Sequence, residues 1–541
     1  MQSQSIGLVV SNVNIRKYRY ERLAFFGLWL AIISYALFYG YVTIERYYRY
    51  DTTVFDMGIF DQAVWLIAHG KPIFLSTRGL TIFADHFSPI LYLIAPLYRI
   101  WDSPKTLLIL QTAACALGAH PVYLYARKRL ENPLPALLFA IAYLLYPALQ
   151  GLNCFDFHPE SIAVPLILYG WWFLASDRFK PSLVCIFFAL LCKETVGLVV
   201  VPLGIYAFFA IDRKRGVILT TVGLMVLFVS LETIRLANHG VSSAYISFYG
   251  AYGNSYLSIF INLLTHPAKI LGALSTGDNF RCIMDLFAPL AFLSFSSPET
   301  LAIAAPAMLS NFLSNRHSMH TIYFQYDATV IPFVLLSAIA GFDLFYRMFS
   351  NRPYVQGIWR AVVILTLIGC VAYGVRNDQA IGNPAISRIS DRYYDAAAIN
   401  EGLSLIPPNA SVSAQSAIAS HLAHRLQIYM FPNPFQRVCW GNSVTALNQE
   451  EGMDLQVKSL DYYKTAIENE KVLYIVLGPF DSSHFPLQGD VFLKIVHIFL
   501  SDKHYGAIWA NQIIILKRGA DYDAGRRLLQ HSGFPEYITM Q

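Results

Sequence analysis

Charged residues are scarce in this chain. Only 14% of its 541 residues are Asp, Glu, Lys or Arg, whereas 55% are hydrophobic. A soluble globular chain carries about 25% charged residues, and a water-soluble fold of this length could not hide so much apolar surface. The composition therefore excludes a water-soluble fold for most of the chain and indicates that lipid is its solvent.

Paired cysteines and several common functional motifs are also missing. The seven cysteines are scattered without a CxxC pair, so we interpret them as small apolar core residues. The sequence has no P-loop, GxGxxG, GxSxG or HExxH pattern, which argues against nucleotide hydrolysis, dinucleotide binding and proteolysis. Basic residues lie in short loops between apolar runs, so the net charge of +5 predicts no nucleic-acid partner.

The sequence does contain a series of long apolar runs. A membrane-spanning helix needs about 20 apolar residues, sometimes as few as 17. By this measure we predict about eleven spans, of which those around 185 and 290 are short. They lie near 23–44, 104–126, 134–150, 161–176, 180–193, 195–211, 216–235, 285–297, 299–314, 328–347 and 357–375.

Basic residues predict how these spans are oriented. The segment 1–22 carries four of them before the first span and has no cleavage site, so we expect it in the cytoplasm of a plasma (inner) membrane protein. Alternation of the eleven spans then puts every basic loop inside. These loops are at 127–129, 178–180, 213–215 and 347–352. The long first loop 45–103, the loops 236–284 and 315–327, and everything after 375 are predicted to lie outside.

The character of the chain changes at about residue 384. Hydrophobic runs shorten; KVLYIVLG (471–478) and QIIILKR (512–518) are typical of buried strands, and 391–405 and 455–469 of helices. We therefore predict a membrane domain over 23–375 and an extracytoplasmic α/β domain over 384–541. Within the latter, we interpret His421, His424 and Arg425 as a solvated helix face.

Ionisable residues gather in the predicted outer segments. Charges at membrane depth are costly and tend to mark sites that face a cavity. Group transfer to a hydroxyl or amine fits them, with a carboxylate as general base and cations or a metal stabilising a phosphate leaving group. The substrate-binding candidates are Asp85, His86, His158, Glu160, Lys193, Glu194, Arg316, His317 and His320, and two further acids in the first outer loop are Asp56 and Asp61.

Structural roles compete with a site at most of these positions. Asp51 and Asp56 have the residue type of helix N-caps, and on one helix Asp56 and Asp61 point about 140° apart, so they are not expected to act as a pair. Other pairs fit a helix cap (Asp85 and His86), a turn (His158 and Glu160) or an ion pair (Lys193 and Glu194).

The two histidines of the third outer loop raise the question of a metal. His317 and His320 have an i, i+3 spacing that suits metal ligation. A zinc site needs at least one further protein ligand, and none is recognised in the sequence. We therefore assign no metal ligand, and a divalent metal cofactor stays an open alternative.

The chain resembles an uncharacterised family of multi-pass membrane proteins, domain of unknown function 2079. The resemblance rests on several motifs taken together, and these extend over most of the chain. These are FDMGIFDQAVWLIAHG (55–70), DHFSPILYLIAPLY (85–98), FDFHPESIAVPL (155–166), LLCKETVGL (190–198), HTIYFQYDATVIPF (320–333) and IPPNASVSAQSAIASHLAHR (406–425). That family is distantly similar to the GT-C membrane glycosyltransferases.

The GT-C resemblance implies a fold, an activity and a base. It implies inverting transfer of a sugar from a polyisoprenyl-phosphate donor, among membrane lipids at the outer face, with an acid of the first outer loop as catalytic base. The matching position is Asp56, with Asp61 second; Met57 after Asp56 departs from the AspGlu and TrpPheAsp patterns of those enzymes. The alternative is a transporter or flippase of a lipid-linked saccharide, although the sequence lacks the internal symmetry typical of transporters.

Overall fold

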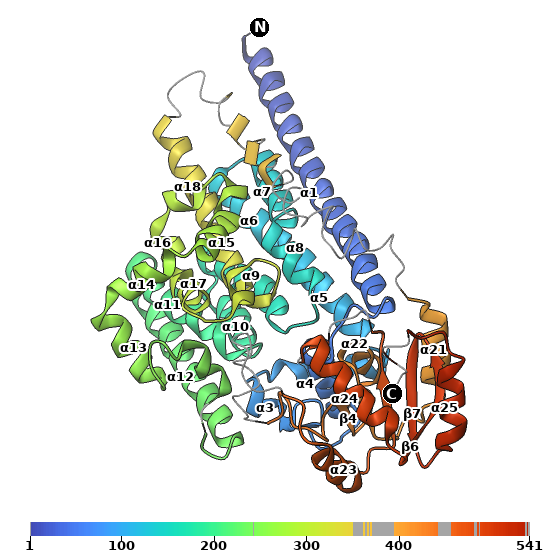
Figure 1. Ribbon diagram of the computed structural model, residues 1–541. Helices are drawn as coiled ribbons and strands as arrows, with labels where there is room; N and C mark the ends of the chain where they lie inside the picture. Colours follow the sequence, from blue (N-terminus) through green and yellow to red (C-terminus); the bar gives the residue numbers. More distant parts are fainter. Residues whose placement is uncertain are drawn as a thin grey trace.

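The computed structural model is largely helical, with a mixed sheet near the C-terminus (Figure 1). It describes residues 2–241, 243–349, 357, 361–362, 365–366, 368–370, 394–441, 456–480, 484–485, 487–535 and 538. The longest helix, α1 (Gln2–Tyr48), runs along one side of the helical part. The C-terminal sheet lies at the end of α1 that is remote from the N-terminus (Figure 1).

The described residues contain four helices that are long and apolar enough to span a membrane, or up to six if two bent pairs each count as one span. The long ones are Arg19–Tyr48 of α1, Lys105–Leu130 (α5, Lys105–Leu117, and α6, Ala119–Leu130), α12 (Arg213–Ala237) and Ile331–Met348 of α18 (Ile331–Phe349). The bent pairs are α7 (Pro133–Leu144) with α8 (Pro147–Cys154), at 42°, and α13 (Tyr256–Thr265) with α14 (Pro267–Leu274), at 91°.

Shorter apolar helices account for more of the predicted spans. They are α9 (Glu160–Ala175), α10 (Phe179–Leu190) and Glu194–Ala210, which ends with α11 (Gly197–Ala210). A further short apolar helix, Ile90–Arg99, lies in the predicted loop 45–103. The count of eleven spans is thus not confirmed and stays a prediction. The predicted span 357–375 lies largely outside the described residues.

The predictions of continuous spans at 285–297 and 299–314 are wrong. Helix α15 (Gly277–Phe287) is followed by 3₁₀ turns, and α16 (Pro298–Leu301) and α17 (Ala305–Phe312) are short. Ala291 and Phe292 have φ values of 51° and 56°, a left-handed conformation that stops a helix of L-residues. Pro289 also removes a backbone donor. Hydrophobicity in this region therefore reflects burial of short segments and not a single long helix.

Small residues allow α11 and α12 to pack closely as an antiparallel pair. A Cβ atom on Gly204 would lie 2.4 Å from the backbone nitrogen of Thr220, and one on Gly216 would lie 2.3 Å from the backbone of Phe208. Close backbone approach through small residues is a usual way for membrane helices to associate, because lipid supplies no hydrophobic drive between them.

Ion pairs join the loops that were predicted to be cytoplasmic. Arg127 pairs with Glu21 of α1, and Arg129 Nε lies 3.1 Å from Asp343 Oδ2. Arg215 lies 2.6 Å from Asp177 in the next loop along the bundle. These contacts gather the basic loops with the first part of α1, as alternating spans require. That this side is cytoplasmic stays a prediction.

The C-terminal sheet has the strand order β4-β3-β5-β7-β6. Strand β3 (Val412–Ala414) is parallel to β4 (Ile428–Met430) and β5 (Tyr474–Leu477), whereas β7 (Ile513–Arg518) is antiparallel to β5 and β6 (Tyr505–Asn511). The strands predicted at 471–478 and 512–518 contain β5 and β7, and those two predictions are confirmed. The predicted helices contain α21 (Ala396–Ser404) and α23 (Leu460–Asn469).

Both faces of this sheet are buried, which explains the uninterrupted apolar strands. Ile514 and Leu516 of β7 pack in a core with α23 and α24 (Gly489–Ser501). Ile513 and Ile515 pack in a second core that includes Val54 of the loop 45–103. The sheet therefore rests directly on the loop that carries the candidate acids.

Candidate functional site

Asp56 lies in a π-helical turn, η1 (Val54–Gly58), that leads into α2 (Ile59–Ala68). Its Oδ2 accepts a hydrogen bond of 3.0 Å from Thr53 Oγ1, and 28% of its side chain is exposed. Burial and the charge of Asp156 raise the pKa of Asp56 to about 7, although Thr53 and Lys193 act in the opposite direction. Asp56 is therefore an acid inside η1 and does not serve as its N-cap.

Asp156 fixes this turn to the end of the first helix. Its Oδ2 accepts hydrogen bonds from Thr53 N at 2.9 Å and from Thr53 Oγ1 at 3.2 Å. Its Oδ1 lies 3.3 Å from the guanidinium of Arg46, in the last turn of α1, and its side chain is fully buried. Asp156 was not assigned to the site from the sequence, although it stands two residues before His158.

His158 faces Asp56 with one ring nitrogen. Its Nδ1 lies 3.0 Å from the carbonyl oxygen of Asp156, and a carbonyl only accepts, so we assign the hydrogen to Nδ1. Its Nε2 lies 3.7 Å from Oδ1 of Asp56. Burial lowers the pKa of His158 to about 4, so the ring is neutral near pH 7 and Nε2 presents a lone pair to Asp56.

Lys193 forms a buried ion pair with Glu160, and their side chains are 8% and 5% exposed. The structural alternative in which Lys193 pairs with its neighbour Glu194 is therefore wrong, because the ion-pair partner of Lys193 is Glu160. Burial alone would lower the pKa of Lys193, but Glu160 and Glu194 raise it above its ordinary value. Glu160 Oε2 has no hydrogen-bond partner among the described residues. The charge of Lys193 also lowers the pKa of Asp56.

A chain of polar contacts extends from this cluster. Glu194 Oε1 lies 3.3 Å from His86 Nδ1, and the hydroxyl of Tyr245 lies 3.4 Å from His86 Nε2 and donates to Asp85 at 2.8 Å. Arg78 holds Asp85 through two hydrogen bonds of 3.0 and 3.2 Å. Asp85 therefore binds a buried arginine, and its interpretation as a helix cap is wrong.

Asp61 lies apart from Asp56. Its side chain is fully buried, and its Oδ1 is 2.5 Å from the hydroxyl of Tyr98 and 2.9 Å from Nε2 of His424 in the distal domain. Asp61 therefore contacts the interface between the two parts of the chain, while Asp56 keeps a partly exposed carboxylate.

The interpretation of 421–425 as a solvated helix face is wrong. His421 stacks between Tyr47 and Tyr50, with ring centroids 4.0 and 4.1 Å away. Arg425 is 6% exposed, and its Nε donates to a carbonyl at 2.7 Å. This segment follows a helix of only four residues, α22 (Ser416–Ala419), and packs on the first outer loop, a tertiary contact that local sequence does not report.

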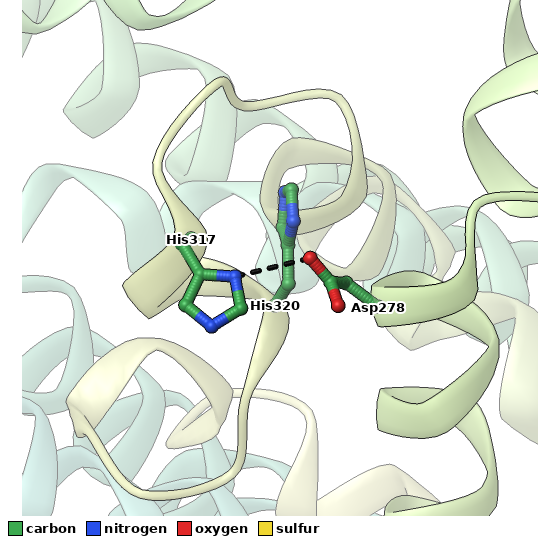
Figure 2. Close-up of side chains that lie close together, drawn as sticks. All are labelled: Asp278, His317 and His320. Carbon is green, nitrogen blue, oxygen red and sulfur yellow. Dashed lines mark hydrogen bonds and ion pairs between the residues drawn. The ribbon is translucent and has the colours of Figure 1, made fainter. Parts of the chain in front are cut away.

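The third predicted loop contributes a separate group next to the cluster. Arg316 stacks over the ring of Phe248 at 5.2 Å. His317 and His320 lie beside Asp278, the first-turn acid of α15 (Figure 2). The same loop carries Phe324, whose ring centroid lies 4.9 Å from that of Phe155, and Phe155 stacks on His158 at 5.4 Å. Most of the candidate residues thus lie in the network of contacts around Asp56. His317 and His320 form a separate group with Asp278.

The fold of this chain is similar to that of solved structures. Two crystal structures of ArnT from Cupriavidus metallidurans share it, one bound to undecaprenyl phosphate (TM-score 0.52) and one in the apo state (TM-score 0.50). In both comparisons the identity is 12%, with 91% of this chain and 98% of the other covered. At this identity the likeness shows the fold.

The chain belongs to the DUF2079 family, described as predicted membrane proteins, whose model matches residues 46–459. The resemblance inferred from the sequence motifs is therefore confirmed. No curated protein matches the chain in sequence.

Proposed function

We propose that this protein is a glycosyltransferase that moves a sugar from a polyisoprenyl-phosphate donor to a hydroxyl or amine acceptor at the outer face of the membrane. The observation that carries the proposal is the state of Asp56. It is a partly exposed carboxylate with a pKa of about 7 in the first outer loop. It lies within a fold shared with ArnT, which has been crystallised with undecaprenyl phosphate.

In the proposed reaction Asp56 acts as general base. The acceptor oxygen or nitrogen attacks the anomeric carbon and forms the new glycosidic bond, while its proton passes to Asp56. The bond between the anomeric carbon and the phosphate oxygen breaks, and the lipid phosphate leaves with the electron pair. A base whose pKa lies near the working pH suits this role, because about half of it is deprotonated and it still accepts a proton readily.

The neighbours of Asp56 have complementary roles in this proposal. The lone pair of His158 Nε2 stabilises the protonated form of Asp56 once the proton has arrived, since the imidazole is already neutral. Lys193 supplies positive charge close to Asp56 for the leaving phosphate. Asp61 is assigned a positioning role, because its buried Oδ1 is bound by Tyr98 and His424.

The experiment uses the full chain in proteoliposomes, supplied with a panel of radiolabelled monosaccharides on undecaprenyl phosphate and a membrane extract as acceptor source. We expect a labelled product that separates from the lipid-linked donor. In Asp56→Asn the rate of its formation should fall by about a hundredfold or more. Asp51→Asn, an acid of the same loop whose side chain takes no part in the contacts above, is the control. Label taken into sealed vesicles without a covalent product would overturn the proposal and favour a transporter.

A further inference from the structure

We propose that Asp278, His317 and His320 form a binding site for a divalent transition metal, with zinc the best match. Each of the three offers one ligand atom, and these atoms lie within 4.8 Å of one another (Figure 2). His317 Nδ1 and Asp278 Oδ2 are already 3.1 Å apart. Tetrahedral zinc with bonds of about 2.0–2.1 Å places its ligand atoms roughly 3.4 Å apart, so small side-chain rotations complete the site.

The ligand set selects the class of metal. Two imidazoles and one carboxylate suit zinc, cobalt or nickel, whereas magnesium and calcium prefer oxygen ligands throughout. Three protein ligands also leave one tetrahedral position for water or another small ligand. The site is therefore expected to bind zinc more tightly than magnesium.

The surroundings of His320 fit a metal ligand. Its Nε2 lies 2.9 Å from the carbonyl oxygen of Ser314, and a carbonyl takes only a donor, so Nε2 carries the hydrogen and Nδ1 is the acceptor atom. Metal-bound histidines usually donate their other ring N–H to such a group, which fixes the ring and increases its basicity. The hydrogen bond to Ser314 therefore fixes the orientation of the His320 ring and leaves Nδ1 available to a metal.

The backbone that carries Asp278 is also fixed. Thr276 caps α15 by accepting a hydrogen bond from Asn279 N. The buried amide of Asn279 donates to the carbonyl oxygens of Ala273 and Phe312, both at 2.9 Å. These bonds hold the first turn of α15 against the segment that leads to His317. The three ligands thus come from two elements whose relative position is already set.

Such a metal would clamp the loop next to the Asp56 cluster. The loop from Leu313 to Val330 is held at one point by a hydrogen bond of 2.9 Å from Asn315 N to the carbonyl of Phe248. Further along, it carries Phe324, whose ring centroid lies 4.9 Å from that of Phe155, and Phe155 stacks on His158 at 5.4 Å. The metal is therefore assigned to ordering this loop, and its binding does not depend on the proposed transferase reaction.

The test measures metal binding by the purified full chain in detergent, with any affinity tag removed and prior treatment with a chelator. Cobalt(II) reports the ligands directly, because tetrahedral coordination by histidine gives intense visible absorption. We expect about one cobalt per chain and its displacement by zinc. His320→Ala and Asp278→Asn should each weaken zinc binding by about tenfold or more.

The matched control is His531→Ala, an exposed histidine whose Nδ1 lies 2.7 Å from a carbonyl of its own helix. It should leave both the absorption and the zinc affinity unchanged. The ligand variants alter side chains at the surface, so the metal-free melting temperature serves as a check of folding. Cobalt absorption that is equal in the wild type and in a variant lacking both His317 and His320 would overturn the proposal and show adventitious binding only.

Discussion

The Nε2 atom of His424 lies 2.9 Å from Oδ1 of Asp61, so a histidine of the distal domain contacts an acid of the loop 45–103. The other ring nitrogen of His424 lies 3.2 Å from Asp102. Burial alone would lower the pKa of His424, but these two carboxylates raise it above its ordinary value. When it is protonated, the ring holds Asp61 and Asp102 of the membrane part against the distal domain.

This contact predicts a pH-dependent docking of the distal domain. A histidine whose pKa is raised by folding stabilises the folded state fully below its unfolded pKa of about 6.5, and the contribution is lost as pH rises through the higher folded pKa. Asp61→Asn should reduce the free energy of unfolding by about 1–3 kcal/mol at pH 6. It should also flatten the fall in stability between neutral and alkaline pH, as measured by thermal unfolding and limited proteolysis.

A control for this prediction exists within the distal domain. Asp502 lies 2.9 Å from His504, a local pair that spans no interface. Asp502→Asn should leave the proteolytic resistance of the junction unchanged at every pH. An Asp61→Asn protein with the wild-type pH dependence would show that His424 does not control docking.

The second prediction is that Asp56→Asn stabilises the protein while it abolishes transfer. A carboxyl whose pKa is raised from 3.8 to about 7 favours its neutral form in the folded state. Stability from this group is present at low pH and is lost as pH rises from about 4 to 7. Above pH 7 the ionised carboxylate costs the folded state at most roughly 4 kcal/mol, and removing the charge should recover part of this free energy. The melting temperature at pH 8 should rise, and a fall there would contradict the assigned environment of Asp56.

The third prediction concerns the pH profile of transfer. After burial, the charge of Asp156 is the largest contribution that raises the pKa of Asp56, whereas the Thr53 hydroxyl lowers it. Asp156→Asn should therefore move the acidic limb of the rate profile to lower pH, and Thr53→Ala should move it to higher pH. Both variants disturb the same turn, so a purely structural effect would lower the rate in both without these opposite displacements.

The membrane helices could be predicted from sequence because length and apolar composition are local properties. The predicted span 23–44 lies within the candidate span Arg19–Tyr48 of α1, and the predicted span 216–235 lies within α12. The prediction failed at 285–314, where proline and two left-handed residues divide an apolar run into short turns. Apolar composition indicates burial in such a case, but it does not indicate the path of the backbone.

The composition of the site was predictable only in part. His158 and Lys193 stand in short polar turns between apolar runs, a pattern that marks a buried site, and both lie close to Asp56. Their partners were not predictable, since Lys193 pairs with Glu160 across two helices and not with its neighbour Glu194. Asp278 could not be joined to His317 and His320, because nothing in its local sequence distinguishes it from a first-turn acid.

The last prediction separates the structural role of Lys193 from its proposed chemical role. Lys193 and Glu160 are buried together, so Lys193→Met leaves an unpaired acid and should destabilise the protein by about 3–5 kcal/mol. Adding Glu160→Gln removes that charge and should restore most of the lost stability. Transfer should stay low in the double variant, because the leaving phosphate still lacks its cation. Thermal unfolding and the labelled-donor assay measure the two effects on the same preparation, and wild-type transfer by the double variant would leave Lys193 with a structural role alone.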